Sequence, residues 1–351
     1  MERFSQKPGI FILVSMFILI GIFTAPIFSQ QLDLPRVSQR AQISQRIGIS
    51  DVTIVYHSPG VKEREIWGKQ VPHGQVWRAG ANENTTIEFS HDVKINGQPL
   101  KAGAYGLHMI PEKSQWTIIF SNNSTSWGSF SYKQEEDALR INVTPKMAEH
   151  REWLSYDFTD RGGNSATVVL HWEKLQVPFS VEVAVNDIVL NDIHSKAGFS
   201  WQSLAQAANY CVQNEMNYEE AMAWIDQSIR LNENFRNLNV KSNLLAKMKR
   251  MADAEKIMDR AVEVADQEWM LNFYGYQLVG QEKLDKAIKV FRMNVERYPE
   301  SWNVYDSLAE ALTKKGDKKG ARENYEKAVM LLPADDSGGN KERIQSIIAS
   351  L

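Results

Sequence analysis

Four alanines recur at a nearly constant interval in the second half of this chain, and they constrain its fold more than any other feature. Ala221, Ala254, Ala287 and Ala321 follow one another after 33, 33 and 34 residues. That interval is the length of one pair of packed helices, and several such pairs stack into an elongated array. A small residue at the repeated position lets the paired helices approach closely. The spacing predicts that residues 197–351 form an all-α stack of helical hairpins.

The later repeats also carry the residues of a known motif. The third has Gly275 where its two helices must pack closely. The fourth contains, in order, Tyr305, Leu308, Ala309, Leu312, Gly316, Ala321, Tyr325, Ala328 and Pro333. This pattern resembles the tetratricopeptide repeat, whereas the first two repeats match it mainly by spacing. Residues 341–351 are amphipathic and are expected to cap the stack. The resemblance implies that the array holds an unknown protein or peptide partner in its groove.

The first 29 residues have the pattern of an export signal. Arg3 and Lys7 precede an uncharged apolar run over residues 9–23, and small and polar residues follow at 25–30. We expect residues 1–29 to be a cleaved signal peptide and the protein to be periplasmic or secreted in a bacterium. The alternative is an uncleaved helix that anchors the protein in the inner membrane, because the run is long for a signal peptide and short for a span.

Residues 52–185 show a period of two, which is the period of β-strands. Nine runs read as strands: residues 52–56, 85–89, 93–95, 105–110, 116–120, 139–143, 154–158, 167–172 and 179–185. No helical pattern lies between them, so we expect an all-β antiparallel sandwich or barrel over residues 30–185. The polar residues 31–50 are expected to lead into the sheet, and residues 186–196 to form a linker to the repeats.

A long segment rich in glycine and proline, residues 58–81, interrupts the strand pattern. A loop of this length inside a compact domain is usually functional or packed as an Ω-loop. It runs into the heptad Trp77-Arg78-Ala79-Gly80-Ala81-Asn82-Glu83. One interpretation is a polar pocket in which Arg78 binds an anionic or carboxylate group. The other is structural: a buried pair of Arg78 and Glu83 ties the loop to the sheet, with Asn82 in a left-handed turn.

The pocket interpretation assigns further roles around this heptad. Asn82 and Glu83 would hydrogen-bond the ligand, and Trp77 would provide a stacking wall. His57 and His108 join the site if the long loop folds over the sheet. The candidate ligand-binding residues are therefore Trp77, Arg78, Asn82, Glu83, His57 and His108.

The same region resembles a known family. Residues 76–89, together with Asn96-Gly97, residues 102–105, Ile110-Pro111, Trp116 and residues 127–130, resemble a secreted bacterial family called domain of unknown function 2911. The resemblance covers about residues 36–183. It implies an all-β fold and brings no established activity, ligand or catalytic residue.

Composition narrows the function classes. The net charge of −3 provides no bulk attraction to nucleic acid, so we expect no such partner. The single cysteine, Cys211, is expected in the core of a repeat helix. The seven histidines show no zinc-binding spacing, so we expect no metal and no cofactor, although His57, His73 and His108 could meet from separate strands. Nucleotide-binding and serine-hydrolase motifs are absent from the sequence.

Two functions from different classes remain. The first is an exported binding or scaffold protein, in which the β domain binds a small polar or glycan ligand and the repeats bind a protein. A sugar platform could be supplied by tryptophans of the β half, namely Trp77, Trp116, Trp127, Trp153 and Trp172, although Trp116 is expected in the core. The second is a periplasmic hydrolase of an envelope glycan or peptide, with Glu83 and a histidine as acid and base.

Overall fold

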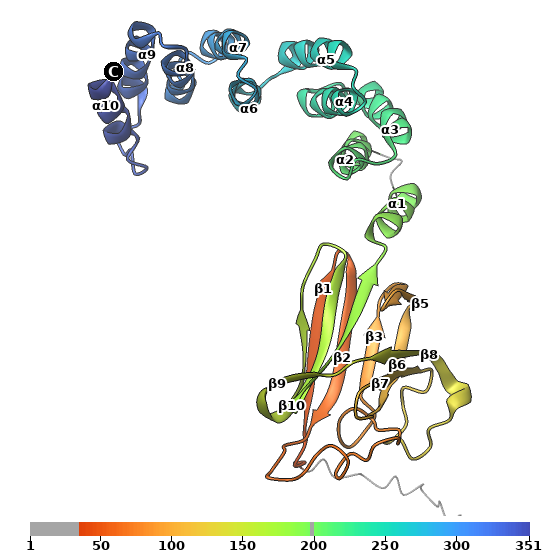
Figure 1. The fold of residues 1–351 in the computed structure, drawn as a ribbon. Coiled ribbons are helices and arrows are strands. Elements are labelled where there is room, and N and C mark those ends of the chain that lie inside the picture. The colour runs from red at the N-terminus through yellow and green to blue at the C-terminus, as the bar shows by residue number, and fades with distance from the viewer. Residues whose placement is uncertain (1–34, 197–199) are drawn as a thin grey trace, which may run out of the picture. The chain divides into compact units, whose positions relative to one another are not determined.

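The computed structural model describes residues 35–196 and 200–351, and these fall into two compact units that divide at Val183 and Ala184. The first unit is built from strands and the second from helices (Figure 1). This confirms the expected fold class, an antiparallel β domain followed by an array of helical hairpins. The expected signal peptide, residues 1–29, lies outside the described residues.

The β unit consists of two sheets in which every strand pairing is antiparallel. The larger sheet contains, in spatial order, β1 (Gln39–Ile47), β2 (Ser50–Ser58), β3 (Thr86–Phe89), β6 (Gly103–Ile110), β7 (Trp116–Ser121) and β8 (Asp137–Val143). The smaller sheet contains β5 (Gln98–Leu100), β4 (Val93–Ile95), β10 (Ser165–Val183) and β9 (Lys146–Thr159). A single 3₁₀ turn, Gln134–Glu136, precedes β8.

The core lies between the two sheets. Phe120 of β7 and Phe179 of β10 meet edge to face with ring centroids 5.7 Å apart. Buried and half-buried residues alternate along β2, so one face of that strand is buried, whereas β7 is buried on both faces except at Thr117. Trp116 is 1% exposed, which confirms its expected place in the core.

Two strands differ from the sequence-based expectation. Residues 39–47, which we expected to be a polar lead-in, form the edge strand β1 and pair along their whole length with β2. An edge strand with one solvated face needs few apolar residues, so its sequence carries little strand signal. The two runs 167–172 and 179–185 belong to one long strand, β10, whose register with β9 shifts after His171 and again after Glu173.

The long loop between β2 and β3 packs as a folded cover over one end of the core. Trp67 and Trp77 from this loop meet Trp116 and Trp172 from the two sheets, with ring centroids 4.9 to 6.0 Å apart. The loop also buries Val61, Ile66 and Val71. Its backbone is thereby held in one conformation without being part of a sheet.

The helical unit contains a leading helix, four hairpins and a final helix. The leading helix is α1 (Val185–Lys196). The hairpins are α2 (Trp201–Gln213) with α3 (Tyr218–Leu231), α4 (Phe235–Lys247) with α5 (Met251–Val264), α6 (Glu268–Gly280) with α7 (Leu284–Arg297), and α8 (Trp302–Lys315) with α9 (Lys318–Leu331). The final helix is α10 (Asn340–Ser350), and its buried Ile344 joins the core of the last repeats.

The recurring small residues lie where the spacing predicted them. Ala221, Ala254, Ala287 and Ala321 are all buried, each in the second helix of its hairpin. A Cβ added to Gly275 of α6 would lie 2.4 Å from a ring carbon of Phe291 in α7. These positions therefore set how closely paired helices pack. Cys211 is buried in α2, as expected.

The segment that we expected to be a linker, residues 186–196, is the helix α1. It has no fully buried residue. It is nevertheless attached to the first hairpin, since His194 contacts Glu220 at 2.7 Å and the hydroxyl of Tyr210 donates to Asn186. The apolar stripe is weak here because no face of this helix is fully buried.

Candidate functional site

The heptad Trp77–Glu83 turns sharply between the long loop and β3. Ala79 and Asn82 have φ values of 50° and 58°, which confirms the expected left-handed turn at Asn82. The carbonyl oxygen of Ala79 accepts hydrogen bonds from Thr85 and from the buried hydroxyl of Tyr156. A Cβ on Gly80 would lie 2.6 Å from Thr85 Oγ1, so glycine is needed there. The turn is therefore rigid, and it aims consecutive side chains in different directions.

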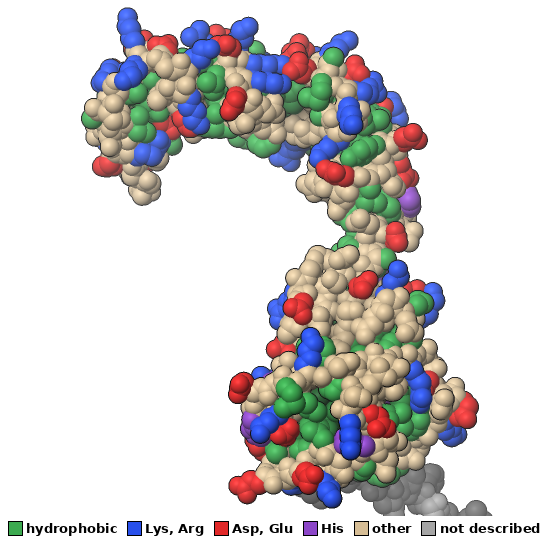
Figure 2. All heavy atoms as spheres, in the orientation of Figure 1, with side chains coloured by type: hydrophobic (Ala, Val, Ile, Leu, Met, Phe, Trp, Pro, Cys, Tyr) green, Lys and Arg blue, Asp and Glu red, His purple; other side chains and the backbone are tan. Residues whose placement is uncertain are grey.

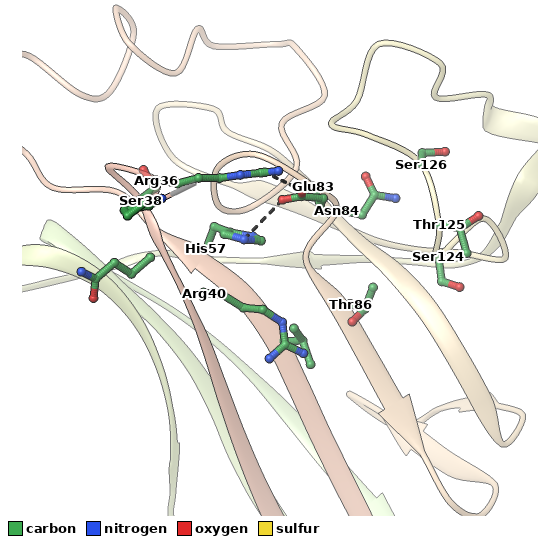
Figure 3. A pocket seen from close by; sticks show the side chains of 13 residues that line it. Arg36, Ser38, Arg40, His57, Glu83, Asn84, Thr86, Ser124, Thr125 and Ser126 are labelled. Atoms are coloured by element: carbon green, nitrogen blue, oxygen red, sulfur yellow. Dashed lines mark hydrogen bonds and ion pairs between the residues drawn. The ribbon is translucent and has the colours of Figure 1, made fainter. Parts of the chain in front are cut away.

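Glu83 faces a pocket of about 690 Å³ between β1, β2 and two loops (Figure 3). Its Oε1 accepts a charge-assisted hydrogen bond from Arg36, and its Oε2 lies 3.3 Å from Nε2 of His57. Arg40 of β1 lines the pocket, and the loop of residues 124–126 lines it opposite Glu83. The pocket is thus lined by two arginines, one carboxylate, one imidazole and several hydroxyl groups.

Burial and neighbouring charges set the ionisation of the two central groups. Burial lowers the pKa of His57, the carboxylate of Glu83 opposes this shift, and Arg36 and Arg40 add to it. Burial alone would raise the pKa of Glu83, but its hydrogen bonds, Arg36 and His57 together hold it below its usual value. At neutral pH the pair is therefore a neutral imidazole beside an ionised carboxylate.

Three polar atoms of this pocket's residues are buried and have no hydrogen-bond partner among the described residues. They are Nδ1 of His57, Oε2 of Glu83 and Oδ1 of Asn84. Buried polar atoms are nearly always paired, because an unpaired one costs about 1–3 kcal/mol. All three atoms belong to residues that line the same pocket.

Arg78 does not pair with Glu83, which corrects one interpretation of the heptad. The guanidinium of Arg78 donates from Nη1 to the carbonyl oxygen of Asn82 and faces the rings of Trp127 and Phe130 at 5.3 and 5.4 Å. Asn82 donates through Nδ2 to the carbonyl oxygen of Ser38. Both residues line a second pocket of about 380 Å³, together with Trp77.

His108 lines neither of these two pockets. Its Nδ1 lies 2.9 Å from Ser129 Oγ, and its ring packs on Tyr132. Burial lowers the pKa of His108 to about 4, and Asp137 opposes part of that shift. The six candidate residues are therefore divided: His57 and Glu83 share one pocket, Trp77, Arg78 and Asn82 line the second, and His108 is in the core.

Several residues of the larger pocket were missed from the sequence. Arg36, Arg40 and Asn84 line it, as do the hydroxyls of residues 124–126. The Ser-Gln-Arg triplet that ends at Arg40 was visible, but only the pairing of β1 with β2 brings it beside His57. Arg36 and Glu83 are far apart in the chain, and nothing in the sequence indicates that they are neighbours in the structure.

Residues 35–196 and 200–351 contain neither a metal-binding cluster nor a membrane-spanning helix. In these residues no three side chains of His, Cys, Asp or Glu converge in a way that could hold a metal ion. His73 packs against Gly68, apart from the pair formed by His57 and Glu83. Across the same ranges, no helix has both the length and the apolar character needed to cross a membrane.

Solved structures resemble part of this chain. No curated protein matches the chain significantly. Solved structures that match the helical part include YrrB, described as a TPR protein with an unusual peptide-binding site (22% identity, 43% of this chain and 75% of that one, TM-score 0.29). Others are MamA from Desulfovibrio magneticus RS-1 (16%, 44% and 93%, TM-score 0.30) and Pseudomonas aeruginosa pilF (16%, 43% and 69%, TM-score 0.30).

Family models match most of the β unit and one hairpin of the helical unit. A protein family of unknown function, DUF2911, matches residues 38–181, which span the two sheets from the beginning of β1 nearly to the end of β10. A tetratricopeptide-repeat model matches residues 303–335, which cover the hairpin of α8 and α9. Residues 38–181 of this chain thus match the DUF2911 family model, and the helical hairpins that follow are of the tetratricopeptide-repeat type, as the match at residues 303–335 indicates.

Proposed function

We propose that this protein is an exported binding protein whose repeats hold a protein or peptide and whose β domain binds a small polar ligand. The observation that carries the proposal is a row of exposed aromatic residues on α6. Trp269, Phe273 and Tyr276 are 41%, 45% and 38% exposed, and their spacing places them on one face of the helix. The opposite face of α6 is buried in the array, so apolar side chains lie on two opposite faces of this helix.

The exposed aromatic row lies on the side of the array where repeat proteins bind partners. Helices α2, α4, α6 and α8 follow the inner side of the helical arc, and their hairpin partners follow the outer side (Figure 1). Hydrophobic side chains also gather along that inner side (Figure 2). Arg236 of α4 packs on the ring of Trp269, and Tyr276 donates to Glu310 of α8. The aromatic row thus has a cation at one end and a carboxylate at the other.

A site-specific cross-link tests the partner-binding role. A photoreactive amino acid is placed at Phe273 in the full chain, and the same amino acid at Met330 serves as the control. Met330 is 77% exposed on α9, in the outer row of helices. We expect a discrete protein adduct from position 273 and none from position 330. Equal labelling from both positions, or none from either, would contradict a partner in the groove.

The β-domain ligand is proposed from the pocket around Glu83. The missing partners of Glu83 Oε2 and Asn84 Oδ1 must be hydrogen-bond donors, because both atoms accept. Hydroxyl groups of a sugar or another polyol satisfy this requirement, and the arginines of the pocket can accept an additional negative group. A calorimetric panel of neutral and acidic sugars tests this, with Arg40→Gln as the variant and Lys94→Gln as the charge-matched control on β4. Binding that neither substitution changes would place the ligand elsewhere.

A hydrolase is the second candidate, because His57 Nε2 lies 3.3 Å from Glu83 Oε2 in an open pocket. A neutral imidazole held beside a carboxylate can use its other nitrogen as a base. That nitrogen, Nδ1, is buried and contacts no hydroxyl of the described residues. Binding is therefore favoured over catalysis in this conformation. Turnover of chromogenic esters or glycosides that disappears in both His57→Asn and Glu83→Gln would reverse the preference.

A further inference from the structure

The second pocket of the β domain differs in chemistry from the pocket around Glu83. It has a volume of about 380 Å³ and is lined by three cationic side chains, Lys62, Arg64 and Arg78, and by no carboxylate. Lys62 and Arg64 come from the exposed rim of the long loop, while Arg78 is half-buried beside them. The three positive charges approach one cavity from two segments of the chain.

None of these three cations forms an ion pair with another described residue. Arg64 donates to the backbone carbonyl oxygens of Val61 and Gly60, and Arg78 donates to that of Asn82. A guanidinium has five N–H donors, so both arginines keep donors that can still bind a ligand. Of the three cations, Arg78 has the largest desolvation cost because it is half-buried. A charge removed from water needs a partner of opposite charge. The pocket therefore lacks a counter-charge.

The remaining wall of the pocket is aromatic. Trp77 and Trp172 stack with ring centroids 5.9 Å apart and planes 20° from parallel. The indole Nε1 of Trp172 is buried without a hydrogen-bond partner among the described residues. Trp127, which is 57% exposed, covers Arg78 at the mouth. Flat apolar surface and an unpaired N–H donor thus lie next to the cations.

The backbone of the long loop is held in strained conformations beside the pocket. Lys62 and Glu63 both have positive φ, at 50° and 59°, although neither is glycine. Such residues persist only where their surroundings hold them in place, and they concentrate at functional sites. Here the backbone N–H of Lys62 donates to Oε1 of Glu152, and this hydrogen bond holds the backbone at Lys62 in place. The carboxylate of Glu152 therefore binds the backbone, and it is not one of the residues that line the pocket.

We propose that this pocket is a second ligand site, separate from the one around Glu83, and that it binds an organic anion. A carboxylate or phosphate group of the ligand contacts Lys62, Arg64 and Arg78, and a ring attached to that group packs against Trp77 and Trp172. Ser38 lines both pockets and lies between them, so the sites are neighbours. An anion in the pocket around Glu83 would lie near a carboxylate, whereas the charged side chains that line the second pocket are all cationic.

Isothermal titration calorimetry on the full chain tests this proposal with four probes: benzoate, phenyl phosphate, inorganic phosphate and neutral benzamide. We expect saturable binding of benzoate or phenyl phosphate with a Kd below about 1 mM and no measurable binding of benzamide. Comparison of benzoate with phenyl phosphate identifies which anion the site takes. Stronger binding of phenyl phosphate than of inorganic phosphate shows that the ring contributes.

The variant Lys62→Gln should weaken the binding about tenfold, because one charge-assisted contact is lost. Lys62 is exposed and its Nζ lies 6.0 Å from the centroid of the Trp153 ring, so the variant should melt like the parent. Lys94→Gln, the same charge change on β4, is the control and should bind normally. Arg40→Gln, in the pocket around Glu83, should also bind normally.

Four results would overturn the proposal. Benzamide binding as tightly as benzoate would show that charge is not recognised. Equal losses of affinity in the Lys62 and Lys94 variants would show that the anion responds only to the net charge of the protein. A loss in Arg40→Gln alone would move the anion to the pocket around Glu83. If no probe binds with a Kd below about 1 mM, a ring-bearing anion is excluded as the ligand.

Discussion

Arg78 and Glu83 lie five residues apart in one turn, yet their side chains enter different pockets. Glu83 contacts Arg36 and His57. Arg78 donates to Asn82 and packs on aromatic rings of the loop that follows β7. The left-handed conformation of Asn82 turns the chain between them. The heptad therefore contributes to two sites and contains no internal ion pair, and this separation determines what substitutions there should do.

Arg78→Ala should lower the free energy of unfolding by about 1–2 kcal/mol. The lost interactions are one hydrogen bond to a carbonyl and the packing on Trp127 and Phe130. The cost of breaking a buried ion pair, about 3–5 kcal/mol, should not appear, because no carboxylate loses its partner. Urea denaturation of the full chain measures the change. A loss above about 3 kcal/mol would indicate a carboxylate contact that the structure does not contain.

Arg36→Gln should change the free energy of unfolding by less than about 1 kcal/mol, because the side chains of Arg36 and Glu83 are each 43% exposed. A double-mutant cycle with Glu83→Gln isolates the interaction, and added salt should weaken it. Since both residues line the larger pocket, the variants should affect ligand binding more than stability. A coupling energy above about 2 kcal/mol would show that the pair is more shielded from water than its exposure indicates.

Stability should fall as the pH is lowered from about 6.5 to about 4, because burial lowers the pKa of His108 to about 4. In this interval the unfolded chain binds a proton at this residue and the folded chain does not, so acid favours unfolding. The shift corresponds to at most about 3 kcal/mol, and His57 acts in the same direction. Chemical denaturation at several pH values measures it. His108→Gln should remove most of this slope, and an unchanged slope would mean that His108 is protonated while folded.

Gly275→Ala should destabilise the helical array by about 1–3 kcal/mol through overpacking. The added Cβ would lie 2.4 Å from a ring carbon of Phe291, so α6 and α7 must separate. Gly280→Ala in the same helix is the matched control, since its Cβ would meet nothing within 4 Å. The control should be neutral or slightly stabilising, because alanine favours the helix. Thermal melts that do not distinguish the two variants would contradict the packing of this hairpin.

The mature protein should begin near Gln30 or Gln31 and should be found in the periplasm or the medium. This follows from the basic start, the apolar run and the small residues around position 29. Cell fractionation and mass spectrometry of the purified protein measure location and terminus together. Recovery of an intact Met1 in the membrane fraction would support the alternative, an uncleaved N-terminal anchor.

Local patterns predicted the elements better than the contacts between them. The spacing of Ala221 to Ala321 located the hairpins because each repeat buries the same small position against the same neighbour. The period of two located most strands of the β domain. Strand β1 was missed because its outward face is polar. Strand β10 was predicted as two strands, because the sequence does not show that one strand can continue through a bulge.

The amino-acid sequence alone was sufficient for the two fold classes, the position of the long loop, the left-handed turn at Asn82 and the close approach at Gly275. Each depends on residues near one another in the chain or on a regular period. The tertiary structure decided which of the six candidate residues share a pocket. Arg36, His57 and Glu83 meet only because β1 pairs with β2 and the long loop folds back over the core. Those contacts depend on long-range packing, which a local pattern does not encode.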